Sequence, residues 1–464
     1  MGEGNGRDEE ISRHDRKSIL VGAESFCPMA SYDPPIDGDT SQRQPASGLW
    51  QNRDFLLLFS AQVISLLGSG VTTVGLALFA YELTGGKSAT AIVGNALMLR
   101  ILAFLLFSQP AGVLADRISR KHILIVMDIG RFALLACFPF VTQVWQIYLL
   151  IFLTNALTAG FTPTFEATIP QIVGPQHYPQ ALSLSRVAVD VEGVASPVLA
   201  GLLIAVFGVR WVFWADGLTY LVSAGLILLT VIPRIQSVQA TWWTGLATDI
   251  FYGSRILLRE PSLRHALMLS FAEATAGAAA IVATVVYVRD TLGKGEFAFV
   301  ATMAAVGLGS SVASLFLGRI VKAVERPASD PAELHRTRHR WTSTMLLVGG
   351  LILGAVLLPG VLLPPLWLFA VLWLFNGVGQ ALVGLPSSVL LAEHTADRER
   401  GRAYAAHFAL THACWLFTYP AIGYAAMAWG APLTFTLAGL LCLATTTLAF
   451  FAGRGTHAPH THQL

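Results

Sequence analysis

The sequence predicts an all-α membrane protein with twelve transmembrane helices in two six-helix bundles. Composition is the first observation: 54% of the 464 residues are hydrophobic and 12% are charged, with a mean hydropathy of +0.60. Soluble domains carry about 25% charged residues. The second observation is a series of long apolar runs, and the third is a polar interruption that divides these runs into two equal sets.

Each apolar run is long enough to cross a membrane, because about 20 mostly apolar residues span roughly 30 Å of hydrocarbon. Gly and Pro interrupt several runs, which transmembrane helices tolerate when neighbouring helices satisfy the freed backbone groups. The twelve predicted spans are 55–81, 89–113, 122–140, 144–166, 182–207, 211–232, 264–288, 297–320, 341–361, 364–391, 403–427 and 432–452.

The polar stretch 233–263 sets the domain organisation. It is expected to be a cytoplasmic linker between an N-terminal bundle, 51–232, and a C-terminal bundle, 264–452. Two matching halves suit a transporter in which one half rocks against the other around a shared site. Residues 1–50 are too polar to form a core and are expected to be a disordered cytoplasmic tail. Residues 453–464 are expected to be a second cytoplasmic tail, which contains histidines.

Lysine and arginine set the predicted orientation. An even number of spans places both termini on one side, and the tails and loops of that side hold 23 of the 30 Lys and Arg residues. Basic loops stay in the cytoplasm. We therefore expect a multi-pass protein of the cell (inner) membrane with both termini cytoplasmic, and the net charge of +2 gives no sign of nucleic-acid binding. The remaining seven basic residues are Lys87, Arg100, Arg131, Arg186, Arg210, Arg289 and Lys294.

Polar stripes run along several predicted spans. Their residues are three or four positions apart, which places them on one helix face. A polar face is costly against lipid, so we expect these side chains to line a central cavity. The alternative is that they satisfy neighbouring backbone and hold helices together. The predicted cavity residues are Gln62, Ser65, Ser69, Asn155, Thr158, Thr162, Asn376 and Gln380.

A charged segment, Gly112–Lys121 (G-V-L-A-D-R-I-S-R-K), lies between the second and third predicted spans. Gly112 permits two helices to approach closely at a turn. Asp116 can pair with cations across an inner gate, and the basic residues hold the loop in the cytoplasm. The predicted gating residues are Gly112, Asp116, Arg117, Arg120 and Lys121.

This segment resembles the loop signature of the major facilitator superfamily, G-x-L-a-D-r-x-x-r-k, and the resemblance covers roughly residues 50–452. It implies secondary transport by alternating access. It also implies that Asp116 locks the two halves in the outward-facing state, with a partner among Arg398, Arg400 and Arg402 or at the start of the eleventh helix, whose dipole favours an anion.

Further stretches narrow the resemblance to a branch of drug and metal exporters: 127–131, 161–170 and 182–201. The stretch Ala405–Pro420, together with the histidine-bearing tail, resembles nickel-resistance exporters. The implied function is export of a divalent metal ion, nickel or cobalt. Export of a small organic molecule, such as a drug or siderophore, is the alternative.

Ionisable residues inside the spans suggest how protons drive transport. Glu273 has no cation three or four positions away, and such a buried carboxyl can take up and release a proton near neutral pH. We expect Glu273, helped by Glu192, to couple proton entry to substrate exit. The arginine found in the fourth helix of many proton-coupled drug antiporters is absent here, where Asn155 and Gly160 lie.

Two further pairs of charged residues have helical spacing. Asp190 lies four positions after Arg186 and is a third candidate for proton coupling, whereas Asp128 and Arg131 are three apart. Pairs of this kind most often hold helices together.

Metal ligands are predicted on the eleventh span. His407 and Cys414 are seven positions apart, so they share a face about 10 Å apart along the helix, and His412 lies on another side. Imidazole suits nickel, cobalt and zinc alike. The alternative is that the histidines bind neighbouring groups and Cys414 packs as a small apolar residue. The tail histidines that are candidate metal ligands are His457, His460 and His462.

Several function classes are excluded by what the sequence lacks. It has no nucleophile–base pair or H-E-x-x-H motif for an enzyme, no cofactor motif, and no G-x-x-x-x-G-K-[ST] motif for an ATP-driven pump. The prediction is therefore a secondary active exporter without a cofactor, for which a monomer suffices and whose partners are a small molecule or metal ion, protons and the lipid bilayer.

Overall fold

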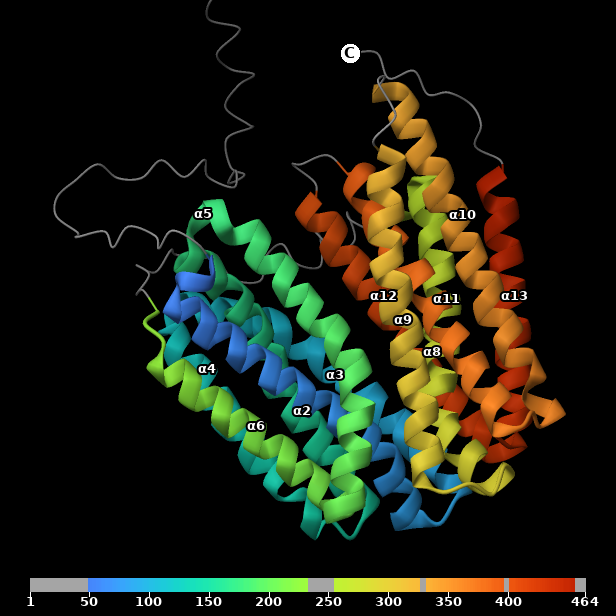
Figure 1. The fold of residues 1–464 in the computed structure, drawn as a ribbon, viewed down its shortest axis with the longest axis horizontal. Coiled ribbons are helices and arrows are strands. Elements are labelled where there is room, and N and C mark those ends of the chain that lie inside the picture. Colours follow the sequence, from blue (N-terminus) through green and yellow to red (C-terminus); the bar gives the residue numbers. More distant parts are fainter. Residues whose placement is uncertain (1–48, 233–253, 326–330, 396–399, 455–464) are drawn as a thin grey trace, which may run out of the picture. The chain divides into compact units, whose positions relative to one another are not determined.

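The computed structural model describes residues 49–232, 254–325, 331–395 and 400–454. The chain divides into two compact units, 1–44 and 45–464, and every described residue belongs to the second. Within the described residues the structure is helical and contains no strand (Figure 1). This confirms the predicted all-α class.

The first half of the chain contains long helices joined by very short connections. Gly174 has a φ of 72°, a conformation that glycine adopts readily, and it divides the longest helix, α5, into the predicted fourth and fifth spans. The elements are η1 (Leu49–Gln51), α2 (Arg53–Thr84), α3 (Lys87–Arg117), α4 (Arg120–Ala136), η2 (Phe138–Phe140), α5 (Val144–Phe207) and α6 (Val209–Leu229).

The second half begins three residues earlier than expected, because Pro261 starts α8 and is suited to a first helical position. Residues 254–259 of the predicted linker are also helical. The elements are α8 (Pro261–Val286), the π-helix η3 (Tyr287–Thr291), α9 (Glu296–Glu325), α10 (Pro331–Leu357), η4 (Leu358–Leu362), α11 (Leu366–Glu393), α12 (Arg400–Trp429) and α13 (Ala431–Arg454).

Ten of these helical segments, among the residues described, are long and apolar enough to cross a membrane. The two other predicted spans are helical as well. One is the second part of α5, where Val191–Phe207 is a shorter apolar segment, and the other is α12, which is 30 residues long but carries several polar side chains. The exact bundle boundaries, and the tails outside 49–454, stay predictions.

The charged segment between the second and third spans differs from the prediction. Helix α3 continues to Arg117 and α4 begins at Arg120, so the connection comprises only Ile118 and Ser119, and Gly112 lies inside a helix instead of at a turn. Hydropathy marks where the chain leaves the lipid, whereas the helical backbone continues beyond that boundary.

Contacts across the chain define two faces. Asp54, near the start of α2, accepts a hydrogen bond of 2.9 Å from the backbone N–H of Val231 after the end of α6. At the other end of α2, the Tyr81 hydroxyl donates to Asp290, which follows α8. We call the face with the start of α2 and the start of α8 the terminal face, and the face with Tyr81 and Asp290 the opposite face.

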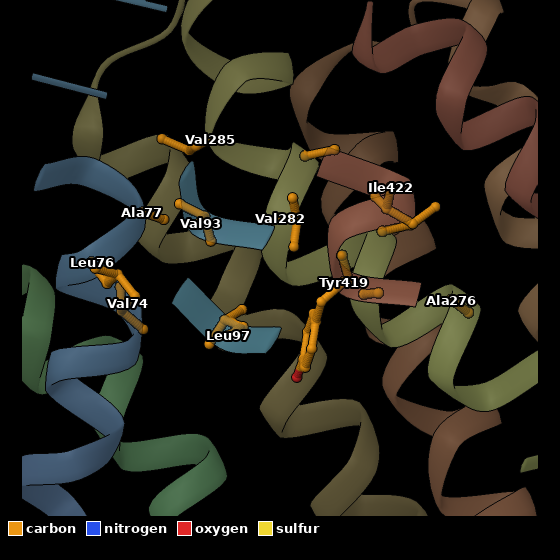
Figure 2. Close-up of a cluster of buried hydrophobic side chains, with 14 of the residues drawn as sticks. Val74, Leu76, Ala77, Val93, Leu97, Ala276, Val282, Val285, Tyr419 and Ile422 are labelled. Atoms are coloured by element: carbon orange, nitrogen blue, oxygen red, sulfur yellow. The ribbon is translucent and has the colours of Figure 1, made fainter. Parts of the chain in front are cut away.

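The buried core includes residues from both halves. Figure 2 shows one part of it, in which α2, α3, α8 and α12 contribute side chains such as Val74, Val93, Val282 and Ile422. Helices α9 and α11 approach closely: a Cβ at Gly309 would collide with the Leu374 carbonyl oxygen. The two halves of the chain therefore share one apolar core.

Candidate functional site

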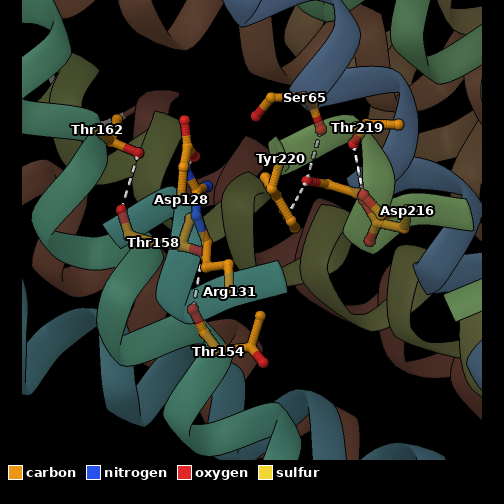
Figure 3. A network of polar contacts seen from close by, with 10 residues as sticks. Ser65, Asp128, Arg131, Thr154, Thr158, Thr162, Asp216, Thr219 and Tyr220 are labelled. Atoms are coloured by element: carbon orange, nitrogen blue, oxygen red, sulfur yellow. Dashed lines mark hydrogen bonds and ion pairs between the residues drawn. The ribbon is translucent and has the colours of Figure 1, made fainter. Parts of the chain in front are cut away.

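A buried ion pair lies in the first half of the chain. Arg131 binds Asp128 one turn earlier on α4, as the spacing predicts, and their side chains are 2% and 0% exposed. The Arg131 guanidinium carbon lies 4.2 Å from the ring centroid of Phe161 and 4.1 Å from that of Tyr220. Figure 3 shows Arg131 with Asp128 and Tyr220. These two rings replace part of the hydration that the cation loses on burial.

Asp216 on α6 is a second buried carboxyl, and the sequence reasoning missed it. Thr72 of α2 donates a hydrogen bond to its Oδ2, and the Thr219 hydroxyl lies 3.3 Å from its Oδ1. Its side chain is buried, with 2% exposed. The signal that would have identified it is the presence of a carboxyl inside an apolar span.

Two of the three predicted cavity residues of α2, Gln62 and Ser69, bind neighbouring helices. Gln62 accepts a hydrogen bond of 2.9 Å from Ser185 on α5, and the hydroxyls of Ser69 and Tyr220 are 2.8 Å apart. Ser65 is buried and its carbonyl accepts from Ser69 at 3.0 Å. These contacts agree with the alternative interpretation, in which polar residues hold helices together.

The predicted cavity residues of α5 and α11 mostly bind within their own helices. Asn155, Thr158 and Thr162 each donate to the carbonyl four residues earlier, at 2.8–3.2 Å. Gln380 donates to the side chain of Asn376 at 2.7 Å, and Asn376 is fully buried. Hydrogen bonds within one helix do not show whether a side chain also faces a cavity. A cavity role for these residues therefore stays a prediction.

Glu273 on α8 is half-buried, and it forms no hydrogen bond or ion pair with any residue that the structure describes. Its Oε1 lies 3.3 Å from where a Cβ would stand at Gly384 on α11, and it interacts electrostatically with Cys414 on α12. The rings of Trp415 and Tyr419 follow on α12, 5.1 Å apart. A Cβ at Gly277, one turn after Glu273, would lie 2.3 Å from the Trp415 ring, so the helices that carry the predicted Glu273 and Cys414 pack together at this aromatic side chain.

Glu192, the second predicted proton-coupling residue, lies half-buried on the second part of α5. It interacts electrostatically with Arg100 of α3, whose Nη1 donates to the Thr73 hydroxyl at 3.2 Å. The side chains of the third candidate, Asp190, and of Arg186 lie outside the described residues.

The predicted metal ligands are not arranged as a ready-made metal site. Among the described residues, no group of three or more His, Cys, Asp or Glu side chains is placed to hold a metal ion. His412 bonds to the Phe408 carbonyl at 2.8 Å and stacks on its ring at 3.7 Å, whereas the Nε2 of His407 is buried without a hydrogen bond. The tail residues His457, His460 and His462 lie outside the described residues.

Of the predicted gating residues, the structure describes the side chains of Arg120 and Lys121 only. The side chains of Gly112–Arg117, and of Arg398, Arg400 and Arg402, lie outside the described part of the structure. Arg120 begins α4. Lys121 donates through Nζ to the carbonyls of Leu228 and Thr230, at 2.7 and 2.8 Å, where a cation suits the end of α6.

On the opposite face, polar contacts join the two halves of the chain. The Tyr81 hydroxyl of α2 donates to Asp290, and Arg289 lies 4.9 Å from the Tyr81 ring centroid. Arg289 also donates to Glu296 at 2.9 Å. We call Tyr81, Arg289, Asp290 and Glu296 the opposite-face contact. Nearby, Thr90 of α3 donates to the Gly423 carbonyl of α12 at 2.9 Å.

Known proteins with a similar sequence are transporters. The MFS-type transporter YfiS of Bacillus subtilis is 27% identical over 47% of this chain and 53% of that protein. Macrolide efflux protein A of Streptococcus pyogenes is 24% identical over 39% and 45%, and the multidrug resistance protein MdtG of Proteus mirabilis is 26% identical over 42% and 48%. The chain spans about half the length of the curated relatives it matches.

Solved structures share the fold. A bacterial homologue of the human lysosomal transporter Spinster, in an inward-facing conformation, has a TM-score of 0.66 and 14% identity, covering 88% of this chain and 98% of that one. A POT family transporter in complex with 5-aminolevulinic acid has a TM-score of 0.69 and 10% identity, with coverages of 89% and 99%.

The family model for the Major Facilitator Superfamily matches residues 58–329 and 336–463, which is most of the chain. Together with the helical fold, this match places the chain in a family of multi-pass membrane transporters. The chain belongs to the major facilitator superfamily.

Proposed function

We propose that the protein is a secondary active exporter of small organic molecules that carry a positive charge, and that protons drive it by alternating access. The observation that carries this proposal is the carboxyl of Glu273, which has no hydrogen bond or ion pair among the described residues. Such a group inside the membrane is costly as a free anion, so it favours binding either a proton or a cation.

The surroundings of Glu273 favour an organic cation. Trp415 on α12 lies against Gly277, one turn after Glu273, and supplies a ring face, which attracts cations and also packs against apolar groups. A substrate with a charged amine and an apolar body would use both features. Exchange of a proton for this cation on Glu273 would couple proton entry to substrate exit, with Glu192 assisting.

Divalent metal export, nickel or cobalt, is the less supported candidate. A transition metal needs several donors in a defined geometry, and no such group is present in the described residues. The names of two similar proteins, a macrolide efflux protein and a multidrug resistance protein, point to organic substrates for those proteins. We extend this substrate class to the present chain.

The proposed orientation places the terminal face in the cytoplasm, because the basic residues concentrate there. Asp116 would then belong to the gate on the cytoplasmic side, and the opposite-face contact would close the external side. The division into bundles 51–232 and 264–452, acting as a monomer, completes this proposal.

The experiment is a tolerance and export assay in cells that express the full-length chain. We expect protection against ethidium and erythromycin, and no protection against Ni²⁺ or Co²⁺. Glu273→Gln is expected to lower ethidium export at least about tenfold. The matched control is Glu260→Gln, which neutralises a carboxyl at the start of the same helix. Protection against Ni²⁺ alone, or full export by Glu273→Gln, would contradict the proposal.

A further inference from the structure

Asp216 is a buried carboxyl that the proposed exchange at Glu273 leaves without a role. It lies on α6 against α2, and a Cβ at Gly68 would collide with its Oδ1. Figure 3 shows Tyr220 between Asp216 and the ion pair of Arg131 with Asp128. The carboxyl is therefore part of the polar cluster inside the first half of the chain.

Burial of Asp216 without an ion pair favours the neutral acid, whereas its two hydroxyl partners can donate to the anion as well. Its hydrogen-bond partners are the hydroxyls of Thr72 and Thr219. Within the described residues, no Lys, Arg or His forms an ion pair with it, because Arg131 binds Asp128. In the observed arrangement an ionised carboxyl at Asp216 would have no ion-pair partner, which is the costly form.

A compensating charge is nevertheless within the same cluster. Arg131 interacts electrostatically with Asp216, and its Nε is buried without a hydrogen-bond partner. An Arg presents five N–H donors, so it can serve two carboxylates. Loss of a proton from Asp216 would therefore set this carboxylate in competition with Asp128 for Arg131.

Glu192 is the candidate acceptor for this proton. This residue contacts the same turn of α2, since a Cβ at Gly70 would lie 2.5 Å from its Oε1. Glu192 is half-buried, whereas Asp216 is buried. Glu192 also interacts with Arg100, which can stabilise its ionised form.

We propose that Asp216 is a proton-carrying residue of the transport cycle, which passes its proton to the Glu192 carboxylate and then draws Arg131 away from Asp128. The proton continues from Glu192 to water, so charge is conserved at each step. The ionisable groups that face Asp216 are Arg131 and Asp128 of α4, Glu192 of α5 and Tyr220 of α6, whereas α2 contributes hydroxyls. Its place in the cycle rests on the proposed export function, but the proton site itself does not.

The first test measures protonation directly, without a substrate. Infrared spectra of the purified full-length protein near neutral pH should contain a carbonyl band of a protonated carboxyl, which Asp216→Asn lacks and Asp54→Asn keeps. If Asp216→Asn does not fold, Asp216→Glu should shift the same band. Identical spectra for wild type and the Asp216 variant would overturn the proposal.

The second test measures ethidium flux in proteoliposomes. For Asp216→Asn we expect uphill transport driven by a proton gradient to fall at least about tenfold, while downhill flux changes less than about twofold. A parallel loss of both fluxes would indicate a structural role and overturn the proposal, and so would unchanged uphill transport.

The comparison with Glu273→Gln separates this proposal from the export function. Glu273→Gln should lower both fluxes, because it removes the proposed cation-binding group. If the wild type itself carries no ethidium, the proposed function fails for this cation, and the infrared result alone decides whether Asp216 holds a proton.

Discussion

The two halves of the chain treat buried carboxyls differently. In the first half Asp128 has an ion pair, and Asp216 receives hydroxyl hydrogen bonds. In the second half Glu273 has neither among the described residues. A carboxyl with a fixed partner contributes to holding helices together, whereas one without a partner is available to a proton or a substrate. The difference indicates that Asp128 has a structural role, whereas Glu273 is open to exchange of a proton or a substrate.

The largest expected effect tests the fixed partner. Arg131→Leu leaves Asp128 as an uncompensated buried acid, and removing one member of a buried pair costs about 3–5 kcal/mol of unfolding free energy. Glu273→Gln removes an unpaired carboxyl and should leave stability unchanged or slightly raised. Thermal unfolding of both purified variants measures the comparison. Equal destabilisation by the two substitutions would remove the proposed difference between the halves.

The pairing itself is checked by a double variant. Asp128→Leu combined with Arg131→Leu removes both charges, and should recover part of the stability lost in Arg131→Leu alone. A double variant that is no more stable than the single one would show that the rings of Phe161 and Tyr220, and not the carboxylate, depend on Arg131.

The next effect concerns how closely helices approach. At Gly309 a methyl group would meet the backbone of α11, so Gly309→Ala should cost about 1–3 kcal/mol through overpacking. At Gly217 in the first half, the nearest atom to a Cβ is a Phe132 ring carbon at 3.3 Å, and Gly217→Ala should cost less. Unfolding midpoints of the two variants rank them, and the reverse order would show that backbone packing is looser in the second half.

The opposite-face contact joins the halves, and its loss should shift their equilibrium. Tyr81→Phe removes one hydrogen bond to a carboxylate, an interaction worth about 1.5–3 kcal/mol. We expect this variant to expose the external side more often, measured as faster thiol labelling of a cysteine introduced at Ala77 on a buried face of α2. The control is Tyr178→Phe, near the other face. Unchanged labelling would mean that this contact does not hold the halves together.

Sequence patterns predicted the features that lie within one helix. Hydropathy located the twelve spans, and the three-residue spacing predicted the pair of Asp128 and Arg131. The contact of Asp216 with Thr72 joins residues 144 positions apart, and helical spacing carries no information about such a partner. Hydropathy did not locate the end of α3 or the start of α4, because it reports the lipid boundary and not the end of the helix.

The smallest effects should be the same in both halves. Thr158 in the first half and Ser387 in the second each donate to the carbonyl four residues earlier, at 2.9 and 2.7 Å. Such bonds stay inside one helix, so Thr158→Val and Ser387→Ala should each change the unfolding free energy by less than about 0.5 kcal/mol. Thermal unfolding and the concentration dependence of ethidium export would be measured together. A weaker apparent affinity for ethidium in Thr158→Val alone, at unchanged stability, would place Thr158 in the substrate cavity and give the first half a share in binding.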